Sequence, residues 1–237
     1  AKRNARDRAV PLNEEPPKLI PEISGKDETG RALPGVGQVR TIKGINYHTL
    51  IRTGNPTVAF RDANEGVAIS ASTYENRLVE TFILNPRWEA DKAVADRSED
   101  GPDMYIADEA LAIIEASMQL LGKQFFYGRT TGDGKGFPGL TDSVLAAYEI
   151  NKSGGGGACH SLYAVKFGPT HVQWVWGENG MLTIPDKRIE TVYRNSLPMT
   201  AYVQDLLAYP GVQVGSTRSL GRIKGLDGTA GKALTDN

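Results

Sequence analysis

Cysteine is almost absent from this chain of 237 residues, because Cys159 is the only one. A single cysteine excludes an internal disulfide framework and any cysteine-rich zinc module. The three histidines, His48, His160 and His171, stand far apart and match no metal-ligand spacing. The sequence therefore predicts neither a metal site nor a bound cofactor.

Long apolar runs are also missing. No stretch approaches the roughly 20 residues that a helix needs to cross a bilayer. The basic start, AKRNARDR, is not followed by the apolar region of a secretory signal. Neither charge sign is in excess, since 27 Lys and Arg face 28 Asp and Glu. We predict a chain without membrane contact that is not a bulk basic nucleic-acid binder.

Two short motifs suggest a catalytic or a phosphate-binding site, and both match the known patterns of such sites poorly. Cys159 and His160 are the residue types of a nucleophile and its base, but neighbours on an extended chain point to opposite sides. The glycine-rich run at 132–136 has Gly136 after Lys135, where a phosphate-binding loop needs Ser or Thr. We assign no catalytic residue and keep a Cys159-dependent hydrolase only as an alternative.

The first half of the chain contains two segments without a core of their own. Residues 1–45 are rich in Pro and Gly and poor in apolar residues, which is typical of a solvated tail or of an arm ordered by a partner. Residues 46–90 alternate apolar and polar residues, with Tyr47, Thr49 and Ile51 on one face. We expect strand at 58–60, 67–69 and 78–84, a turn or loop at 70–73, and overall a long two-stranded hairpin lying on another surface.

The clearest helix follows near the middle of the chain. After an acidic connector, residues 106–121 lack Gly and Pro and carry Leu111, Ile114, Met118 and Leu121 at helical spacing. Gly122 is the expected helix end. Glycine-rich loops follow, then strands at 162–167, 171–176, 181–184 and within 188–225. Trp174 and Trp176 share a strand face, which is typical of a core or an interface. The fold class is α+β.

Several short runs, in register from about residue 45 to about 225, resemble the major capsid proteins of a group of tailed bacteriophages. The longest is YHTLIRTGNPTVAFR at 47–61. The others lie at 64–67, 72–73, 91–96, 125–128, 136–140, 161–168 and 171–180. The resemblance implies the Hong Kong 97-type phage capsid fold, with an N-terminal arm, an extended loop, a long spine helix, and peripheral and axial domains.

The resemblance also implies a domain organisation and a function. Residues 1–45 correspond to the arm, 46–90 to the extended β-hairpin loop, 91–128 to the connector and spine helix, and 129–237 to the peripheral and axial strands. A chain of this family is not an enzyme. It assembles into hexamers and pentamers of an icosahedral shell in the host bacterial cytoplasm, encloses double-stranded DNA without sequence-specific binding, and meets scaffold, portal or decoration proteins.

The residues leave three points open. Relatives usually continue past the segment at 221–223, so we expect part of the axial domain to be missing. Charged residues on the predicted hairpin are candidates for contacts between subunits, with a solvated hairpin face as the alternative: Arg61, Glu65, Arg77 and Glu80. An encapsulin-like nanocompartment, which has the same fold and encloses a cargo enzyme, is the alternative to a phage head.

Overall fold

The computed structural model describes residues 24–26, 32–34, 37, 39–99, 101–152, 159–178 and 186–227. The chain divides into two compact units, each made from separate stretches of sequence. The first takes Ala1–Gly35, Ile83–Lys123 and Asn179–Tyr209, and the second takes Val36–Phe82, Gln124–Glu178 and Pro210–Asn237. Helices and mostly antiparallel strands build the chain, which confirms the α+β prediction.

Most of the expected N-terminal arm lies outside the described residues. Two short strands of the first unit, β1 (Ser24–Lys26) and β2 (Ala32–Pro34), pair antiparallel within it. The strand expected at 181–184 also falls on residues that the structure does not describe. The domain boundaries that the family resemblance implies therefore stay predictions.

The first unit is built on a three-stranded antiparallel sheet in the order β10-β11-β6. Its strands are β6 (Arg87–Asp91), β10 (Arg188–Arg194) and β11 (Leu197–Asp205). A tight turn joins β10 to β11 because Asn195 and Ser196 both adopt positive φ, at 51° and 65°. Such a turn matches the right-handed twist of the strands that it connects.

Two helices follow β6. Asp91 caps the short α1 (Lys92–Ala95) by accepting a hydrogen bond of 2.9 Å from the backbone N–H of Ala93. The long α2 (Gly101–Thr131) then begins, and Ile106 packs with Ala90, Ala95 and Tyr202 in a buried cluster. This cluster joins one face of the sheet to the first turns of α2.

Helix α2 is longer than the sequence predicted. The expected end at Gly122 is wrong, because regular helix continues past it to a break at Gly128, and a last helical turn follows to Thr131. Its buried stripe also differs: Leu121 is buried as predicted, but Leu111 is 54% exposed, and the small residues Ala110 and Ser117 are buried instead. Small side chains on the inner stripe let a helix approach its neighbours closely, which spacing of large apolar residues does not reveal.

The true break in α2 lies at Gly128, whose backbone is non-helical with φ 62° and ψ −150°. Beyond it, the carboxylate of Asp142 accepts hydrogen bonds from the backbone N–H groups of Arg129 and Thr130, at 2.5 and 3.3 Å. It also accepts one from the Thr130 hydroxyl at 2.5 Å and one from the N–H of Gly139 at 3.3 Å. Asp142 therefore binds N–H groups freed by the break.

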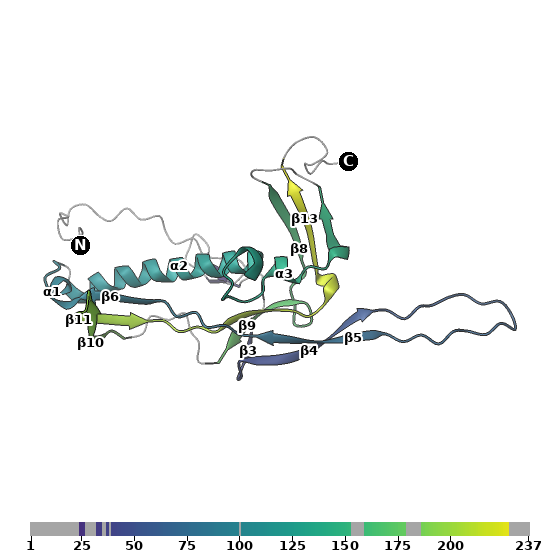
Figure 1. Cartoon of the computed structure of the whole chain (residues 1–237), viewed down its shortest axis with the longest axis horizontal. Coiled ribbons are helices and arrows are strands. Elements are labelled where there is room, and N and C mark those ends of the chain that lie inside the picture. The colour runs from purple at the N-terminus through teal and green to yellow at the C-terminus, as the bar shows by residue number, and fades with distance from the viewer. Residues whose placement is uncertain are drawn as a thin grey trace. The chain divides into compact units, whose positions relative to one another are not determined.

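The second unit contains the long hairpin. Strand β4 (Asn46–Gly54) pairs antiparallel with β5 (Thr73–Glu80), which confirms a long two-stranded excursion. Figure 1 shows it as a ribbon that leaves the neighbourhood of β3 and β9 and ends in an open loop. The inner face carries Tyr47, Thr49 and Ile51 as predicted, with Ile51 only 1% exposed.

The strand predictions beyond β4 need correction. Residues 55–72 are extended but not strands, and the chain reverses at Asp62, where the N–H of Glu65 bonds to the Asp62 carbonyl at 3.3 Å. Asn64 there has a positive φ of 66°, which Asn tolerates. The strand expected at 78–84 ends at Glu80, and from Phe82 the chain leaves β4, because the Phe82 N–H bonds to the Pro210 carbonyl.

Two further three-stranded sheets complete the second unit. One has the order β12-β9-β3 and the other β7-β13-β8. The strands of the first are β3 (Val39–Ile42), β9 (Val172–Gly177) and β12 (Pro210–Val214), and those of the second are β7 (Glu149–Asn151), β8 (His160–Val165) and β13 (Leu220–Leu226). Short helical turns lie at α3 (Leu140–Ser143), η2 (Ala146–Tyr148) and η3 (Thr217–Ser219).

Aromatic rings form the core of this unit. Trp174 of β9 is fully buried and stacks on Phe125 with ring centroids 4.8 Å apart. Phe137 meets Trp174 edge-on at 5.8 Å. The prediction of a core role thus holds for Trp174, whereas Trp176 is partly exposed. Stacked and edge-on pairs are the favoured arrangements of aromatic rings.

Replacing Gly128 by Ala tests the break in α2. A Cβ at this position would lie 2.0 Å from the Asp142 carboxylate and 2.5 Å from the Gly139 nitrogen, at a φ that disfavours any side chain. We expect a loss of about 2–3 kcal/mol in the free energy of unfolding, measured by urea denaturation. Gly134→Ala is the control, because its Cβ meets nothing within 4 Å. Equal midpoints for the two variants would contradict the prediction.

The hydrogen bonds that the Asp142 carboxylate accepts predict a pH dependence of stability. Burial alone would raise the pKa of Asp142, but hydrogen bonds from the Thr130 hydroxyl and from backbone N–H groups lower it below the ordinary value of 3.8. A carboxyl with a lowered pKa stabilises the fold above that ordinary value, and the contribution disappears as the pH falls through the folded-state pKa. We expect Asp142→Ala to cost about 1 kcal/mol near neutral pH, a modest figure because the carboxylate is exposed.

The difference between wild type and Asp142→Ala should shrink steadily below the ordinary pKa of the carboxyl. Urea denaturation at several pH values measures it. Asp186→Ala removes another exposed carboxylate and serves as the control. A cost that stays constant down to the acid limit would show that Asp142 acts through packing and not through its charge.

Candidate assembly surfaces

The residues that suggested chemistry do not form a reaction centre. Cys159 is exposed, and His160 is the exposed first residue of β8. His171 lies elsewhere, where its Nδ1 is 2.8 Å from the Ser219 hydroxyl. Within the described part of the chain, no group of three or more His, Cys, Asp or Glu side chains is placed to hold a metal ion.

The glycine-rich run at 132–136 is part of a closed loop. The buried Gln124 amide donates to the carbonyls of Asp133 and Phe137, at 3.1 and 2.8 Å, and its oxygen accepts from the Asp133 N–H at 3.0 Å. The loop is therefore held against helix α2 by a buried side chain. Its backbone N–H at Asp133 is already used and does not point at an open phosphate site.

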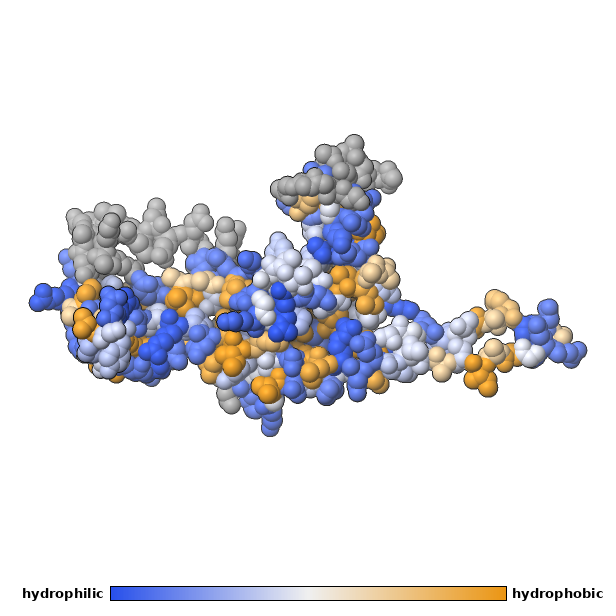
Figure 2. Space-filling view, in the orientation of Figure 1, coloured by the Kyte–Doolittle hydropathy of each residue, from blue (hydrophilic) through white to orange (hydrophobic). Residues whose placement is uncertain are grey.

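The end of the β4–β5 hairpin exposes large apolar side chains. Four large side chains there are strongly exposed to solvent: Val58 at 89%, Phe60 at 108%, Val67 at 64% and Ile69 at 102%. Figure 2 shows hydrophobic side chains gathered on both arms near this end, next to the hydrophilic turn that closes the hairpin. We call these four residues the apolar tip. Clustered exposed apolar residues of this size mark an interaction site.

The charged candidates occupy different parts of this hairpin. Arg61 and Glu65 lie together at the turn, where the Arg61 guanidinium donates to the Glu65 carbonyl at 2.7 Å. The Glu65 carboxylate in turn accepts from the Asp62 N–H at 3.2 Å. These contacts close the turn within one chain, so that the apolar tip lies just behind a locally braced, charged turn.

The other two candidates lie on β5. Arg77 is 3.7 Å from Glu75, and its side chain is only 27% exposed because it shares the inner face with the buried Val79. Glu80 is exposed at the last position of the strand. The structure thus places all four charged candidates on one hairpin but does not bring them together into one cluster.

The sheet of the first unit carries exposed ion pairs on one face. Glu190 of β10 contacts both Arg188 and Arg87, the latter at 2.9 Å, and Arg188 also reaches Asp205. The hydrogen bond from Arg188 lowers the pKa of Glu190. Exposed pairs of this kind add little to stability, although together they define a patterned charged surface.

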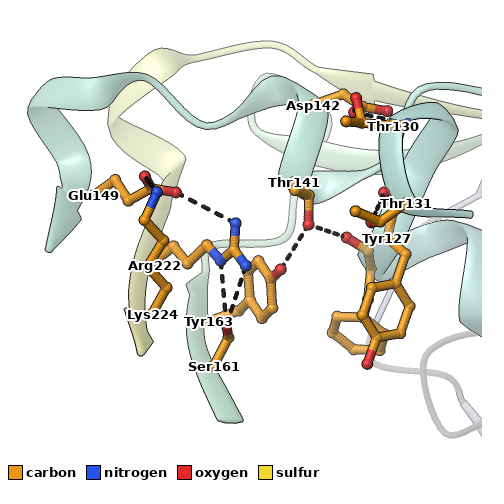
Figure 3. A network of polar contacts seen from close by, with 11 residues as sticks. Tyr127, Thr130, Thr131, Thr141, Asp142, Glu149, Ser161, Tyr163, Arg222 and Lys224 are labelled. Carbon is orange, nitrogen blue, oxygen red and sulfur yellow. Dashed lines mark hydrogen bonds and ion pairs between the residues drawn. The ribbon is translucent and has the colours of Figure 1, made fainter. Parts of the chain in front are cut away.

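A polar network covers one face of the β7-β13-β8 sheet (Figure 3). Glu149 contacts Lys224 and, at 3.3 Å, Arg222, and the hydrogen bond from Lys224 is the main cause of its lowered pKa. Arg222 also donates to the Ser161 hydroxyl at 3.1 Å. The Tyr163 hydroxyl lies 2.7 Å from that of Thr141, outside the sheet. The network joins strands that are far apart in the sequence.

The opposite face of this sheet is apolar. Ile150, Ile223 and Leu162 lie in register across its three strands. Ile150 is 56% and Leu162 is 46% exposed.

Residues from such remote positions give no local sequence signal. The apolar tip did leave one, since strand-like alternation at 58–60 and 67–69 was visible, but it indicated strand and not a docking surface.

A family model described as "Major capsid protein GP7" matches residues 37–236. No curated protein sequence matches the chain. Among the helices that the structure describes, none combines the length and hydropathy required to cross a bilayer.

Solved structures share the fold at low sequence identity. A chain of bacteriophage Epsilon15 superposes with a TM-score of 0.64 at 19% identity, covering 94% of this chain and 66% of its own. The SrpI encapsulin of Synechococcus elongatus PCC 7942 has a TM-score of 0.56 at 12% identity, covering 98% and 99%. A chain of Mycobacterium phage Bobi has a TM-score of 0.52 at 10% identity, covering 90% and 92%.

The chain thus spans about two thirds of the length of the Epsilon15 protein that it matches. The capsid and encapsulin fold predicted from the sequence is confirmed by these likenesses. Since the family model covers residues 37–236, most of the sequence, the chain belongs to the Major capsid protein GP7 family and is a structural protein of a virion capsid, not an enzyme.

Proposed function

We propose that the chain builds the head of a tailed bacteriophage by assembling with copies of itself into hexamers and pentamers, which close into an icosahedral shell around double-stranded DNA. Membership of a major capsid protein family supports the shell-forming role. Rings arise when one surface meets a different surface of the next copy and the rotation closes. Assembly takes place in the host bacterial cytoplasm, with scaffold, portal or decoration proteins as further partners.

The apolar tip is the observation that carries the proposal. Phe60 and Ile69 expose essentially their whole side chains to solvent, which is unfavourable in a protein that stays monomeric. In the proposed shell the hairpin is the extended loop of residues 46–90 and lies over a neighbouring copy. The tip then buries its side chains against that copy, and the turn at Arg61 and Glu65 fixes the register of the contact.

The remaining domain assignments are part of the same proposal. Residues 1–45 are the N-terminal arm, 91–128 the connector and spine helix, and 129–237 the peripheral and axial strands. A net charge of −1 supports a container that does not grip its genome, because tight DNA binding needs many phosphate contacts from Lys and Arg.

An encapsulin-like compartment is the second candidate. The likeness to the SrpI encapsulin, which covers nearly all of both chains, supports it at the level of the fold. The family model favours the phage head. The contents of purified particles separate the two, because a phage head encloses DNA and a nanocompartment encloses a cargo protein.

Light scattering and negative-stain images of the same purified fraction test the proposal. Closed particles of megadalton mass are the expected result. A chain that remains a monomer of 25.6 kDa at all concentrations would contradict self-assembly of this sequence. Particles that contain protein cargo but no nucleic acid would favour the compartment.

The apolar tip gives a mutational prediction for assembly. Phe60→Ser with Ile69→Ser removes two large side chains that are exposed in the subunit and buried in the proposed contact. Burying such a pair contributes about 4 kcal/mol, so the affinity of the contact should fall about 1000-fold. We expect the variant to stay unassembled at concentrations where wild type forms shells, with an unchanged circular dichroism spectrum.

The matched control is Ala59→Ser with Ala68→Ser, which adds hydroxyl groups to the same two exposed arms without removing large apolar surface. It should assemble like wild type. If the Phe60 and Ile69 variant assembles with the same concentration dependence as this control, the apolar tip is not part of the contact between subunits.

The charged candidates give a kinetic prediction. Arg61→Gln with Arg77→Gln should lengthen the half-time of assembly at low salt and leave the final yield nearly unchanged, because charges of this kind steer encounter more than they add affinity. The effect should fade at an ionic strength of about 1 M, where the screening length is about 3 Å. Light scattering measures the half-times.

Lys166→Gln changes the charge at an exposed residue outside the hairpin and is the control. It should leave the half-time unchanged. A loss of yield in the double arginine variant that persists at high salt would show that these residues make direct contacts, whereas no effect at any salt would leave them as part of a solvated hairpin face.

A further inference from the structure

The base of the hairpin is joined to the β12-β9-β3 sheet by backbone contacts. Next to the last residue of β5, the N–H of Thr81 bonds to the Ile45 carbonyl at 2.9 Å, and the N–H of Phe82 bonds to the Pro210 carbonyl of β12 at 2.9 Å. Figure 1 shows β4 beginning and β5 ending near β3 and β9. The hairpin is therefore held at one end and extends freely at the other.

Gly211 of β12 lets this base approach closely. A Cβ at Gly211 would lie 2.5 Å from the Glu80 carbonyl oxygen and 3.5 Å from the Thr81 Cα. Both of these are backbone atoms and have little freedom to move aside. The absence of a side chain at residue 211 thus sets how near the end of β5 lies to the sheet.

Near the base of the hairpin, two buried glutamine side chains and one tyrosine form a hydrogen-bond network. The Gln213 side-chain oxygen accepts hydrogen bonds from the Tyr47 hydroxyl of β4 and from the Gln173 amide of β9. Gln213 and Gln173 are only 3% and 4% exposed. Burial raises the pKa of Tyr47, so its hydroxyl remains protonated and able to donate. The Arg40 guanidinium lies over the ring of Tyr47, 4.4 Å from its centroid.

The apolar packing beside this network does not by itself define the orientation of the hairpin. Val79 of β5 packs with Ile42 and Val175 in a small buried cluster, and Tyr47 contacts it. Hydrophobic contacts are non-directional, whereas a buried hydrogen bond has a narrow range of angle and distance. Beside the backbone bond from Phe82 to Pro210, which orients the end of β5, the bond from Tyr47 to Gln213 is therefore a directional side-chain contact that orients β4 against β12.

The length of the hairpin amplifies any error at its base. At about 3.3 Å per residue, the 17 steps from residue 46 to residue 63 span about 56 Å. A rotation of only about 5° at the base would move the far end by about 5 Å on that length. Side chains pack productively only when they are placed to within a fraction of this distance.

We propose that Gln213, held in place by Gln173, is the positioning residue of the hairpin and acts through the Tyr47 hydroxyl to aim the apolar tip at a second copy of the chain. The aiming of the hairpin is a property of the single chain. Its use in docking rests on the proposed function.

Electron spin resonance measures the orientation of the hairpin as a distance between two spin labels. Spin labels are attached at Ala59→Cys on the hairpin and Lys166→Cys on the body of the same unit, with Cys159→Ser to remove the native thiol. The full chain carries Phe60→Ser and Ile69→Ser so that it stays unassembled. We expect a narrow distribution of label-to-label distances.

Tyr47→Phe is the test variant, because it removes one hydroxyl and keeps the ring. The population of deflected orientations should rise about fivefold, as loss of one net buried hydrogen bond implies. Tyr74→Phe removes the same atom from an exposed tyrosine of the same hairpin, 54% exposed, and should leave the distribution unchanged. Gly211→Ala should shift the mean distance, because the new Cβ pushes against the Glu80 carbonyl.

The outcomes separate this inference from the proposed function. A broadened distribution in Tyr47→Phe supports positioning, whether or not the wild-type chain forms shells. In chains with an intact tip, Tyr47→Phe should also assemble more slowly than Tyr74→Phe. Distributions for Tyr47→Phe and Tyr74→Phe that coincide, or a Gly211→Ala chain whose mean distance equals that of the parent, would overturn the inference.

Discussion

A two-stranded ribbon has no interior, and this constraint organises the second unit. Among the described residues, only one end of the β4–β5 hairpin has neighbours, so its apolar residues divide into two groups. Ile51 and Val79, towards the base, are 1% and 4% exposed, whereas Phe60 and Ile69 are fully exposed. The buried group attaches the hairpin to its own chain. The exposed group finds no such place among the residues that the structure describes, which is why the proposed function places it against a neighbouring copy.

The body that holds this hairpin depends on a different contact, the stacking of Phe125 on Trp174 at 4.8 Å. Phe125 comes from the last turns of α2 and Trp174 from the central strand of the β12-β9-β3 sheet. Gly128 ends the regular helix one turn after Phe125, and Asp142 binds the N–H groups that the break exposes. Strand β9 thus connects the aromatic core to Gln173, which fixes the hairpin base from the neighbouring position in the sequence.

The sequence allowed much of the fold to be predicted, but less of the surfaces. Alternation at Tyr47, Thr49 and Ile51 indicated β4 correctly because only one face of it is buried. The helix end at Gly122 was wrong, since glycine is tolerated inside a helix whose following turn carries a core residue. Contacts such as Tyr47 to Gln213 join residues 166 positions apart, and no local pattern encodes them. The family resemblance supplied the function, which composition and spacing alone did not.

The exposed tip creates a conflict between folding and assembly, since side chains that suit a specific contact also favour aggregation. Charges placed around it reduce that risk. Arg61, Asp62 and Glu65 form the turn directly beyond Phe60, and their contacts with one another hold the turn closed. Charged residues flanking an apolar segment discourage random pairing, because an incorrect partner must desolvate them. A surface that supplies partners for these groups relieves that cost. In the proposed contact between copies, the braced, charged turn supplies the selectivity, whereas the apolar residues alone would bind any hydrophobic surface.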